Sequence, residues 1–85
     1  ARALAGVLAD LASTHQVIVV THLAQVAVMA DKHYVVSKEP GDVPQTHLDE
    51  VTGDARTAEI ARMLSGDRSE ASLAHAKQML EEARA

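Results

Sequence analysis

The sequence predicts an α/β fold in one small domain spanning residues 1–85. Three observations support this fold class. Apolar residues recur every three or four positions near both ends of the chain, as on one face of a helix. Residues 17–20 are four consecutive β-branched residues, which is typical of a strand covered on both faces in a parallel sheet. Residues 39–44 have the Pro and Gly content of a turn, which separates two further strand-like stretches.

The first half of the chain predicts a helix and then a β-α-β unit. The first helix is expected to end near Ser13 and Thr14, and its apolar face consists of Leu4, Val7, Leu8 and Leu11. The buried strand at residues 17–20 follows, and residues 23–31 predict a second helix. Residues 33–37 predict the next strand, joined to the first by a right-handed crossover.

The second half predicts a hairpin followed by two helices. Residues 45–51 are mostly polar, and we expect them to form an edge strand paired with residues 33–37. Residues 52–54 offer a cap for a helix that stops at Ser65 and Gly66. Ser69 can cap the last helix, one side of which carries Leu73, Ala76, Leu80 and Ala83. The predicted order is therefore α-β-α-β-β-α-α, with a parallel β-α-β unit and an edge hairpin.

The composition restricts the possible functions. The formal net charge is -4, and the eight Lys and Arg residues are spread along the chain, so we do not expect this segment to bind a nucleic acid backbone directly. The chain has no cysteine, which excludes disulfide and thiol chemistry and suits a cytoplasmic protein. Its apolar runs are much shorter than the roughly 20 residues that span a bilayer, so no membrane partner is expected.

His22 is the strongest candidate for a functional residue. It follows the predicted buried strand, and ligands of open α/β sheets bind at the carboxyl ends of the parallel strands. An imidazole in that place can donate a hydrogen bond to an anionic oxygen. A partly buried histidine that caps the next helix would occupy the same position, so position alone fits both interpretations equally.

The other chemistry-bearing residues are expected to be structural. The remaining histidines have no metal-binding spacing, so we expect no metal site and solvent-facing positions for His15, His33, His47 and His75. We interpret the acidic residues Asp49, Glu50 and Asp54 as a solvated face, and the methionines Met29, Met63 and Met79 as core filling. The chain contains no GxxxxGK[ST] phosphate-binding loop, no Gly-rich dinucleotide-binding turn and no GxSxG nucleophile motif.

Two stretches of the sequence carry a resemblance to a known family. The first is THLAQVA at residues 21–27, after the predicted strand, and the second is RTAEIARMLSG at residues 56–66, followed by AHA at residues 74–76. Over essentially its whole length, the chain resembles the C-terminal part of the ATPase head in the RecN family, which are SMC-like members of the ABC class. The family usually reads THLPQVA. Ala24 replaces the proline here, which alters the first turn of the helix but leaves the histidine in place.

The resemblance implies a role in ATP hydrolysis for His22 as the switch histidine of the H-loop. It would contact the γ-phosphate of ATP and act by positioning and charge stabilisation. ATP and Mg²⁺ would bind in the complete head, and the protein partners would be the rest of that head and a second head. DNA would be bound by other regions, during double-strand break repair and recombination at the cytoplasmic nucleoid. No catalytic role is carried over for Gln25, Asp31, Arg56 or Arg62. Gln25 and Asp31 could help to orient the loop, although helix packing explains both as well. The two arginines could contact a partner lobe, but we expect them to solvate their helix.

Two other functions remain open. The chain could be a non-catalytic α/β interaction module in which the THL turn is purely structural, or the same segment of an ABC-class ATPase for chromosome organisation or transport. The parent protein is expected to be an ATPase. Because the Walker A, signature and Walker B motifs are absent from these residues, we expect the chain to be inactive by itself.

Overall fold

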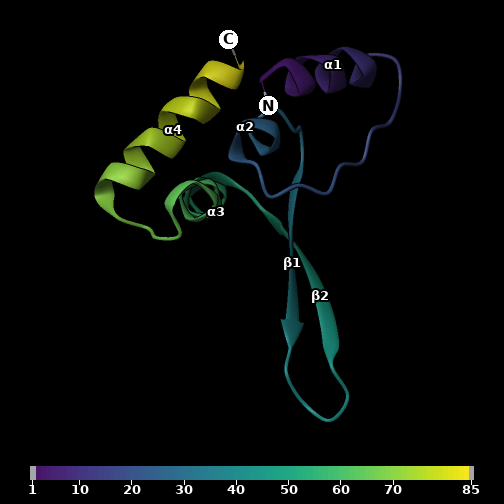
Figure 1. The fold of residues 1–85 in the computed structure, drawn as a ribbon, viewed down its shortest axis with the longest axis vertical. Helices are drawn as coiled ribbons and strands as arrows, with labels where there is room; N and C mark the ends of the chain where they lie inside the picture. Colours follow the sequence, from purple (N-terminus) through teal and green to yellow (C-terminus); the bar gives the residue numbers. More distant parts are fainter. Residues whose placement is uncertain (1, 85) are drawn as a thin grey trace.

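The structure is a computed structural model that describes residues 2–84. Its elements are, in order, α1 (Arg2–Ala12), α2 (Ala24–Ala27), β1 (His33–Glu39), β2 (Gln45–Val51), α3 (Gly53–Ser65) and α4 (Glu70–Arg84). Figure 1 shows the β1–β2 hairpin projecting away from the group of helices. The radius of gyration is 13.9 Å, whereas a compact chain of this length is expected to have one of about 12 Å. The projecting hairpin accounts for this elongation.

The core lies where α2, α3 and α4 meet. Its buried members are Ala24, Ala27, Val28, Ile60, Ala61 and Ala76, and the partly buried residues around them are Met63, Leu64, Leu73, Met79, Leu80 and Ala83. Ile60 is the largest side chain that is fully buried, and most of the other buried residues are alanines. The helices therefore pack closely around small side chains. The apolar stripes predicted for α3 and α4 are confirmed, and Met63 and Met79 pack against the core as expected. Met29 was expected there too, but it is 39% exposed, so that prediction was wrong.

The hairpin is confirmed as an antiparallel pair. Its register runs from His33 opposite Val51 to Glu39 opposite Gln45, with residues 40–44 as the connecting turn. Most side chains of both strands are exposed, including Val36, which is 61% exposed. A two-stranded ribbon is marginally stable alone, so this hairpin depends on its attachment to α3 at the base.

The strand predicted at residues 17–20 is not formed in this structure. The sheet of the described chain contains β1 and β2 only, and residues 17–20 have no regular secondary structure. The side chains of Ile18 and Val20 are 85% and 97% exposed. A strand requires backbone hydrogen-bond partners, and an apolar sequence alone does not supply them. The predicted parallel β-α-β unit and the first strand of the predicted order are therefore not confirmed in the described chain.

The two N-terminal helices also differ from the prediction. Helix α1 ends where expected, and a turn at Ser13 and Thr14 follows it. However, its apolar face is largely uncovered, since Leu4 is 52% and Val7 is 62% exposed. Helix α2 spans Ala24–Ala27 instead of residues 23–31. A less regular turn continues the path of α2 as far as Ala30.

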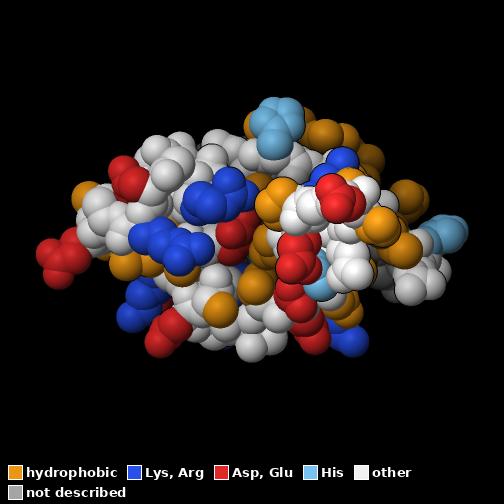
Figure 2. Space-filling view, turned by 90° about the horizontal axis from the view of Figure 1, so that it is seen from below, with side chains coloured by type: hydrophobic (Ala, Val, Ile, Leu, Met, Phe, Trp, Pro, Cys, Tyr) orange, Lys and Arg blue, Asp and Glu red, His pale blue; other side chains and the backbone are white. Residues whose placement is uncertain are grey.

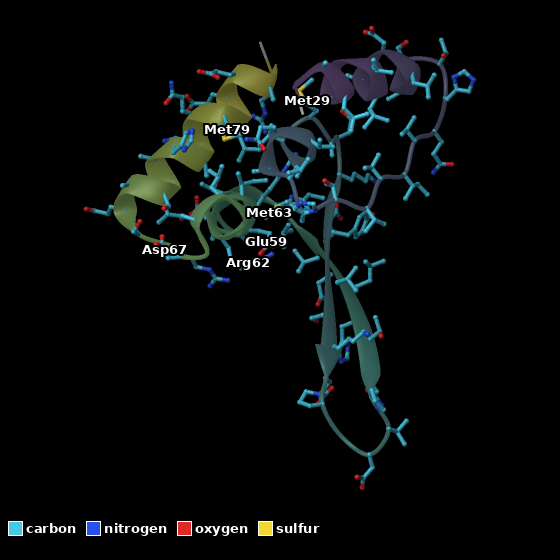
Figure 3. The ribbon with its side chains drawn as sticks, viewed as in Figure 1. Met29, Glu59, Arg62, Met63, Asp67 and Met79 are labelled. Carbon is cyan, nitrogen blue, oxygen red and sulfur yellow. The ribbon has the colours of Figure 1, made fainter. Side chains whose placement is uncertain are left out.

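The corner between α3 and α4 is determined by local sequence. Gly66 ends α3 with a left-handed φ of 76°, and its N–H donates to the carbonyl of Arg62. Ser69 caps α4, because its hydroxyl oxygen accepts a hydrogen bond from the N–H of Ser72 at 3.3 Å. Asp67, labelled in Figure 3, accepts from the N–H of Ser69 at 3.0 Å, and this bond is the main reason that its pKa is lowered. Both predicted boundaries are confirmed.

We expect the substitution Gly66→Ala to destabilise the chain by about 1 kcal/mol, because an L-residue is strained at this positive φ. A Cβ at Gly66 would have no neighbour within 4 Å, so the loss would come from the backbone and not from a clash. Gly6→Ala is the matched control, since Gly6 is helical and has equally open space. Thermal unfolding should show a lower midpoint for Gly66→Ala and no loss for Gly6→Ala. Equal midpoints for the two variants would contradict the assignment of Gly66 as a left-handed cap that requires glycine.

We also expect the isolated chain to self-associate through residues 17–20, because exposed apolar side chains lie there on a segment that is not paired in a sheet. Val20→Lys should reduce the average mass measured by sedimentation velocity. Val43→Lys is the matched control, since Val43 is also exposed but lies in the hairpin turn. If both variants sediment in the same way as the unaltered chain, self-association through this segment is ruled out.

Candidate functional site

The turn that carries His22 is closed by a hydrogen bond. The N–H of Leu23 donates to the hydroxyl oxygen of Thr21 at 3.0 Å. The bond thus joins the two residues on either side of His22. The side chains of Thr21 and Leu23 are half-buried, whereas that of His22 is exposed. The turn therefore fixes its two ends against the protein and presents the imidazole between them to solvent.

Helix α2 connects this turn to the core. Leu23 is its N-cap, with an extended backbone, and the carbonyl of Leu23 accepts from the N–H groups of Val26 and Ala27 at 3.1 Å each. Ala24, which stands where the resembling family has proline, is 3% exposed and belongs to the core cluster. A helix of four residues does not persist without tertiary contacts. The orientation of His22 thus depends on how α2 packs.

Arg56 of α3 contacts α2 directly. Its Nη2 donates to the carbonyl oxygens of Ala27 at 3.2 Å and Ala30 at 2.8 Å. Burial lowers the pKa of Arg56, the charge of Arg84 lowers it further, and Asp31 raises it. The expectation that Arg56 merely solvates its helix was wrong, because this side chain is half-buried and joins two elements.

Glu59 is a buried acid that the sequence did not reveal. It is 8% exposed, and the Nε of Arg62 donates to both of its carboxylate oxygens at 3.0 Å. Figure 3 shows the pair side by side on α3. The hydrogen bonds from Arg62 hold the pKa of Glu59 below its ordinary value, although burial opposes this. Arg62 remains about half exposed, so it solvates the helix as expected and also neutralises the buried acid.

Three of the other histidines lie on the surface as predicted. The Nδ1 of His15 is 2.8 Å from the hydroxyl of Thr14, and the Nε2 of His47 is 3.0 Å from a carboxylate oxygen of Glu39. His75 is exposed on α4. Within residues 2–84, no group of three potential metal ligands lies together.

His33 contradicts the prediction of a solvent-facing position. It is half-buried at the start of β1, and its Nδ1 is enclosed without a hydrogen-bond partner in the described structure. Burial lowers the pKa of His33, and the charge of Arg56 lowers it further, while Glu59 raises it. His33 is therefore part of the junction between the hairpin and α3, and it is favoured in its neutral form.

The hollows found in residues 2–84 lie away from His22. The larger encloses about 360 Å³, and its walls are Val28, Met29, Ala30, Asp31, Arg56, Leu80, Ala83 and Arg84. His22 lines neither this hollow nor the second one, and its side chain is exposed.

The surface charge is mixed. Asp49, Glu50 and Asp54 are exposed, as predicted for a solvated face. Figure 2 shows acidic and basic side chains intermingled on the face that includes the end of the hairpin. No helix within residues 2–84 has the length and apolar character needed to cross a membrane.

Of the residues singled out from the sequence, the structure places His22 in an exposed turn and Gln25 and Asp31 in exposed positions nearby. It does not join His22 to the other histidines or to the acidic residues. Sequence reasoning missed the buried positions of Glu59 and His33 and the contact that Arg56 makes with α2. For Arg56 the reason is distance along the chain. Its acceptors lie 29 and 26 positions earlier in the chain, so no local spacing could have identified them.

Comparison with known proteins shows extensive similarity to one group. The chain is 53% identical over 79 residues to DNA repair protein RecN of Deinococcus radiodurans, covering 92% of this chain and 14% of that protein. It is 51% identical over 78 residues to RecN of Mycobacterium leprae, covering 91% of this chain and 13% of the relative. RecN of Treponema pallidum is 46% identical over 82 residues, with 94% and 14% covered. No protein-family model matches the chain.

These figures describe a short segment of a longer relative. The chain spans about 14% of the length of the curated relatives it matches. Because the similarity extends over more than nine-tenths of the chain, it includes both stretches that carried the resemblance.

We expect the stability of the chain to fall as the pH decreases below the ordinary histidine pKa of 6.5, through His33. The folded-state pKa of His33 is lower than 6.5, so between the two values the unfolded state binds more protons. Stability from this residue is therefore complete above pH 6.5 and is lost as the pH falls towards the folded-state pKa. Urea unfolding at a series of pH values should show this dependence, and it should be weaker in His33→Gln. An identical pH dependence in His47→Gln and His33→Gln would contradict the assignment to His33.

Proposed function

Because this chain is a segment of the RecN family, we propose that it forms the C-terminal part of the ATP-binding head of a DNA repair ATPase. In this proposal the parent protein acts in double-strand break repair and recombination. The segment contributes one catalytic residue, His22, to a site whose other components lie elsewhere in the parent. The observation that carries the proposal is the exposed His22 in a turn fixed at both ends.

His22 would act as the switch histidine that contacts the γ-phosphate of bound ATP. Within the described residues, its imidazole is exposed to solvent, so it is accessible to an anionic oxygen. The turn that carries it is held by the hydrogen bond between Leu23 and Thr21. A hydrogen bond from this ring would stabilise the negative charge that develops on the phosphate oxygens. Bound ATP and Mg²⁺ supply the phosphoryl group and its charge neutralisation. The segment itself provides the position of the ring and the proton on its nitrogen.

The uncovered apolar surfaces support a place inside a larger domain. Ile18 and Val20 are exposed on a segment outside the sheet, and the predicted apolar face of α1 is largely exposed as well. In the complete head, residues 17–20 would pair with neighbouring parallel strands, and the apolar side chains would be covered. Such pairing would place His22 at the carboxyl end of a strand, where ligands of α/β sheets bind.

The proposed partners follow from the same arrangement. The rest of the head would provide the phosphate-binding loop and the catalytic carboxylate, and a second head would provide the signature motif. DNA would be bound by other regions of the parent, since this segment has a net charge of -4 and mixed surface charge. The proposed location is the cytoplasm, at the nucleoid.

We expect His22→Ala in the full-length parent to lower the rate of ATP hydrolysis by about 100-fold or more, because one positioned donor to the developing charge is lost. Binding of ATP should remain close to that of the unaltered protein. Steady-state phosphate release and equilibrium nucleotide binding measure the two quantities. His75→Ala is the matched control, since His75 is also exposed but lies on α4. Unchanged turnover in His22→Ala would exclude the switch role and favour a non-catalytic interaction module.

A further inference from the structure

We propose that Arg56 is a positioning residue for His22, which it influences through helix α2. This inference rests on the proposed function, because it concerns how the switch histidine is held. The two residues are not in contact. They are connected by a continuous series of hydrogen bonds through the short helix that follows the turn.

The first link is between Arg56 and the end of α2. Ala27 is the last residue of α2, and Ala30 ends the irregular turn after it. Carbonyl groups in the last turn of a helix lack their usual partner four residues on, and a side-chain donor placed there can satisfy them. The carbonyl of Ala27 also accepts from the N–H of Ala30 at 3.1 Å, so Arg56 adds a second donor to it. The Nη2 of Arg56 donates to both carbonyls, at 3.2 Å and 2.8 Å. One guanidinium nitrogen thus fixes the distance between α3 and the end of α2.

The second link runs through α2 to the turn. The N–H of Ala27 donates to the carbonyl of Leu23 at 3.1 Å, and the N–H of Leu23 donates to Thr21 at 3.0 Å. His22 lies between Thr21 and Leu23. A shift of Ala27 therefore moves Leu23 and with it the backbone that carries the imidazole.

Two properties of α2 make this connection matter. The helix has four residues, so its own hydrogen bonds do not stabilise it. Its residues on the core are mostly alanines, which have no long side chains to resist rotation. The directional hydrogen bonds of Arg56 provide that resistance. Arg56 is half-buried and its Nε is enclosed, so the side chain has little freedom to choose other partners.

The test is a double-mutant cycle in the full-length parent, with steady-state ATP hydrolysis as the readout. Arg56→Gln should lower kcat by about tenfold and leave the KM for ATP within about twofold, because the fault is in positioning and not in binding. In a His22→Ala background, Arg56→Gln should lower kcat no further, since the group that it positions is gone. A purely structural role would lower kcat by the same factor in both backgrounds.

Two additional variants separate positioning from charge and folding. Arg56→Lys keeps a donor near the two carbonyls and should recover part of the lost kcat. Arg68→Gln is the control, because Arg68 is an exposed cation just after α3. It should leave kcat within about twofold of the unaltered protein. Hydrogen exchange of the amides of residues 26–30 should accelerate in Arg56→Gln and remain unchanged in Arg68→Gln.

The outcomes distinguish the two proposals. If His22→Ala leaves kcat unchanged, the proposed function fails, and the inference about Arg56 fails with it. If His22→Ala lowers kcat but Arg56→Gln has no effect, or has the same effect in both backgrounds, only the inference about Arg56 is overturned. If the parent carrying Arg56→Gln does not fold, Arg56→Lys takes its place in the cycle. Its loss of kcat should then disappear in the His22→Ala background. The same loss of kcat in both backgrounds would contradict the proposal.

Discussion

The packing of α2 against α3 is the contact on which the rest of the structure depends. It joins the N-terminal part of the chain, including the turn at His22, to the two C-terminal helices. The contact combines close approach of small side chains around Ile60 and Ala61 with two hydrogen bonds from Arg56 to the end of α2. Burial provides the attraction between the helices, and the hydrogen bonds determine their alignment. Without this contact, α2 is too short to remain helical, and the turn before it would lose its fixed orientation.

The part of the fold governed by local sequence was predictable. Gly66 ended α3 because glycine adopts a left-handed backbone without strain, and Ser69 began α4 because its hydroxyl accepts from a free N–H. The hairpin was also predictable, since the turn at residues 40–44 brings β1 and β2 together within a few residues. In each of these cases the interacting groups are near one another in the sequence.

The remaining features could not be predicted, because they depend on groups that are distant or outside the chain. Residues 17–20 have the sequence of a buried strand, but their hydrogen-bond neighbours are not among the described elements. Arg56 and His33 were expected at the surface, and both are half-buried where the start of α3 meets earlier parts of the chain. His22 was identified from the sequence, and the structure adds the bond between Leu23 and Thr21 that braces its turn. Its contact with phosphate stays a prediction.

The small size of the core side chains has a thermodynamic consequence. Heat-capacity and enthalpy changes on unfolding increase with the apolar area that becomes exposed, and here Ile60 is the largest fully buried side chain. The isolated chain should therefore absorb little heat per residue as it unfolds, and do so over a wide temperature range. A shallow transition of this kind makes the midpoint temperature unusually sensitive to small changes in free energy. In the longer protein, the cooperativity of unfolding of this segment would then come mostly from its contacts with the surrounding domain.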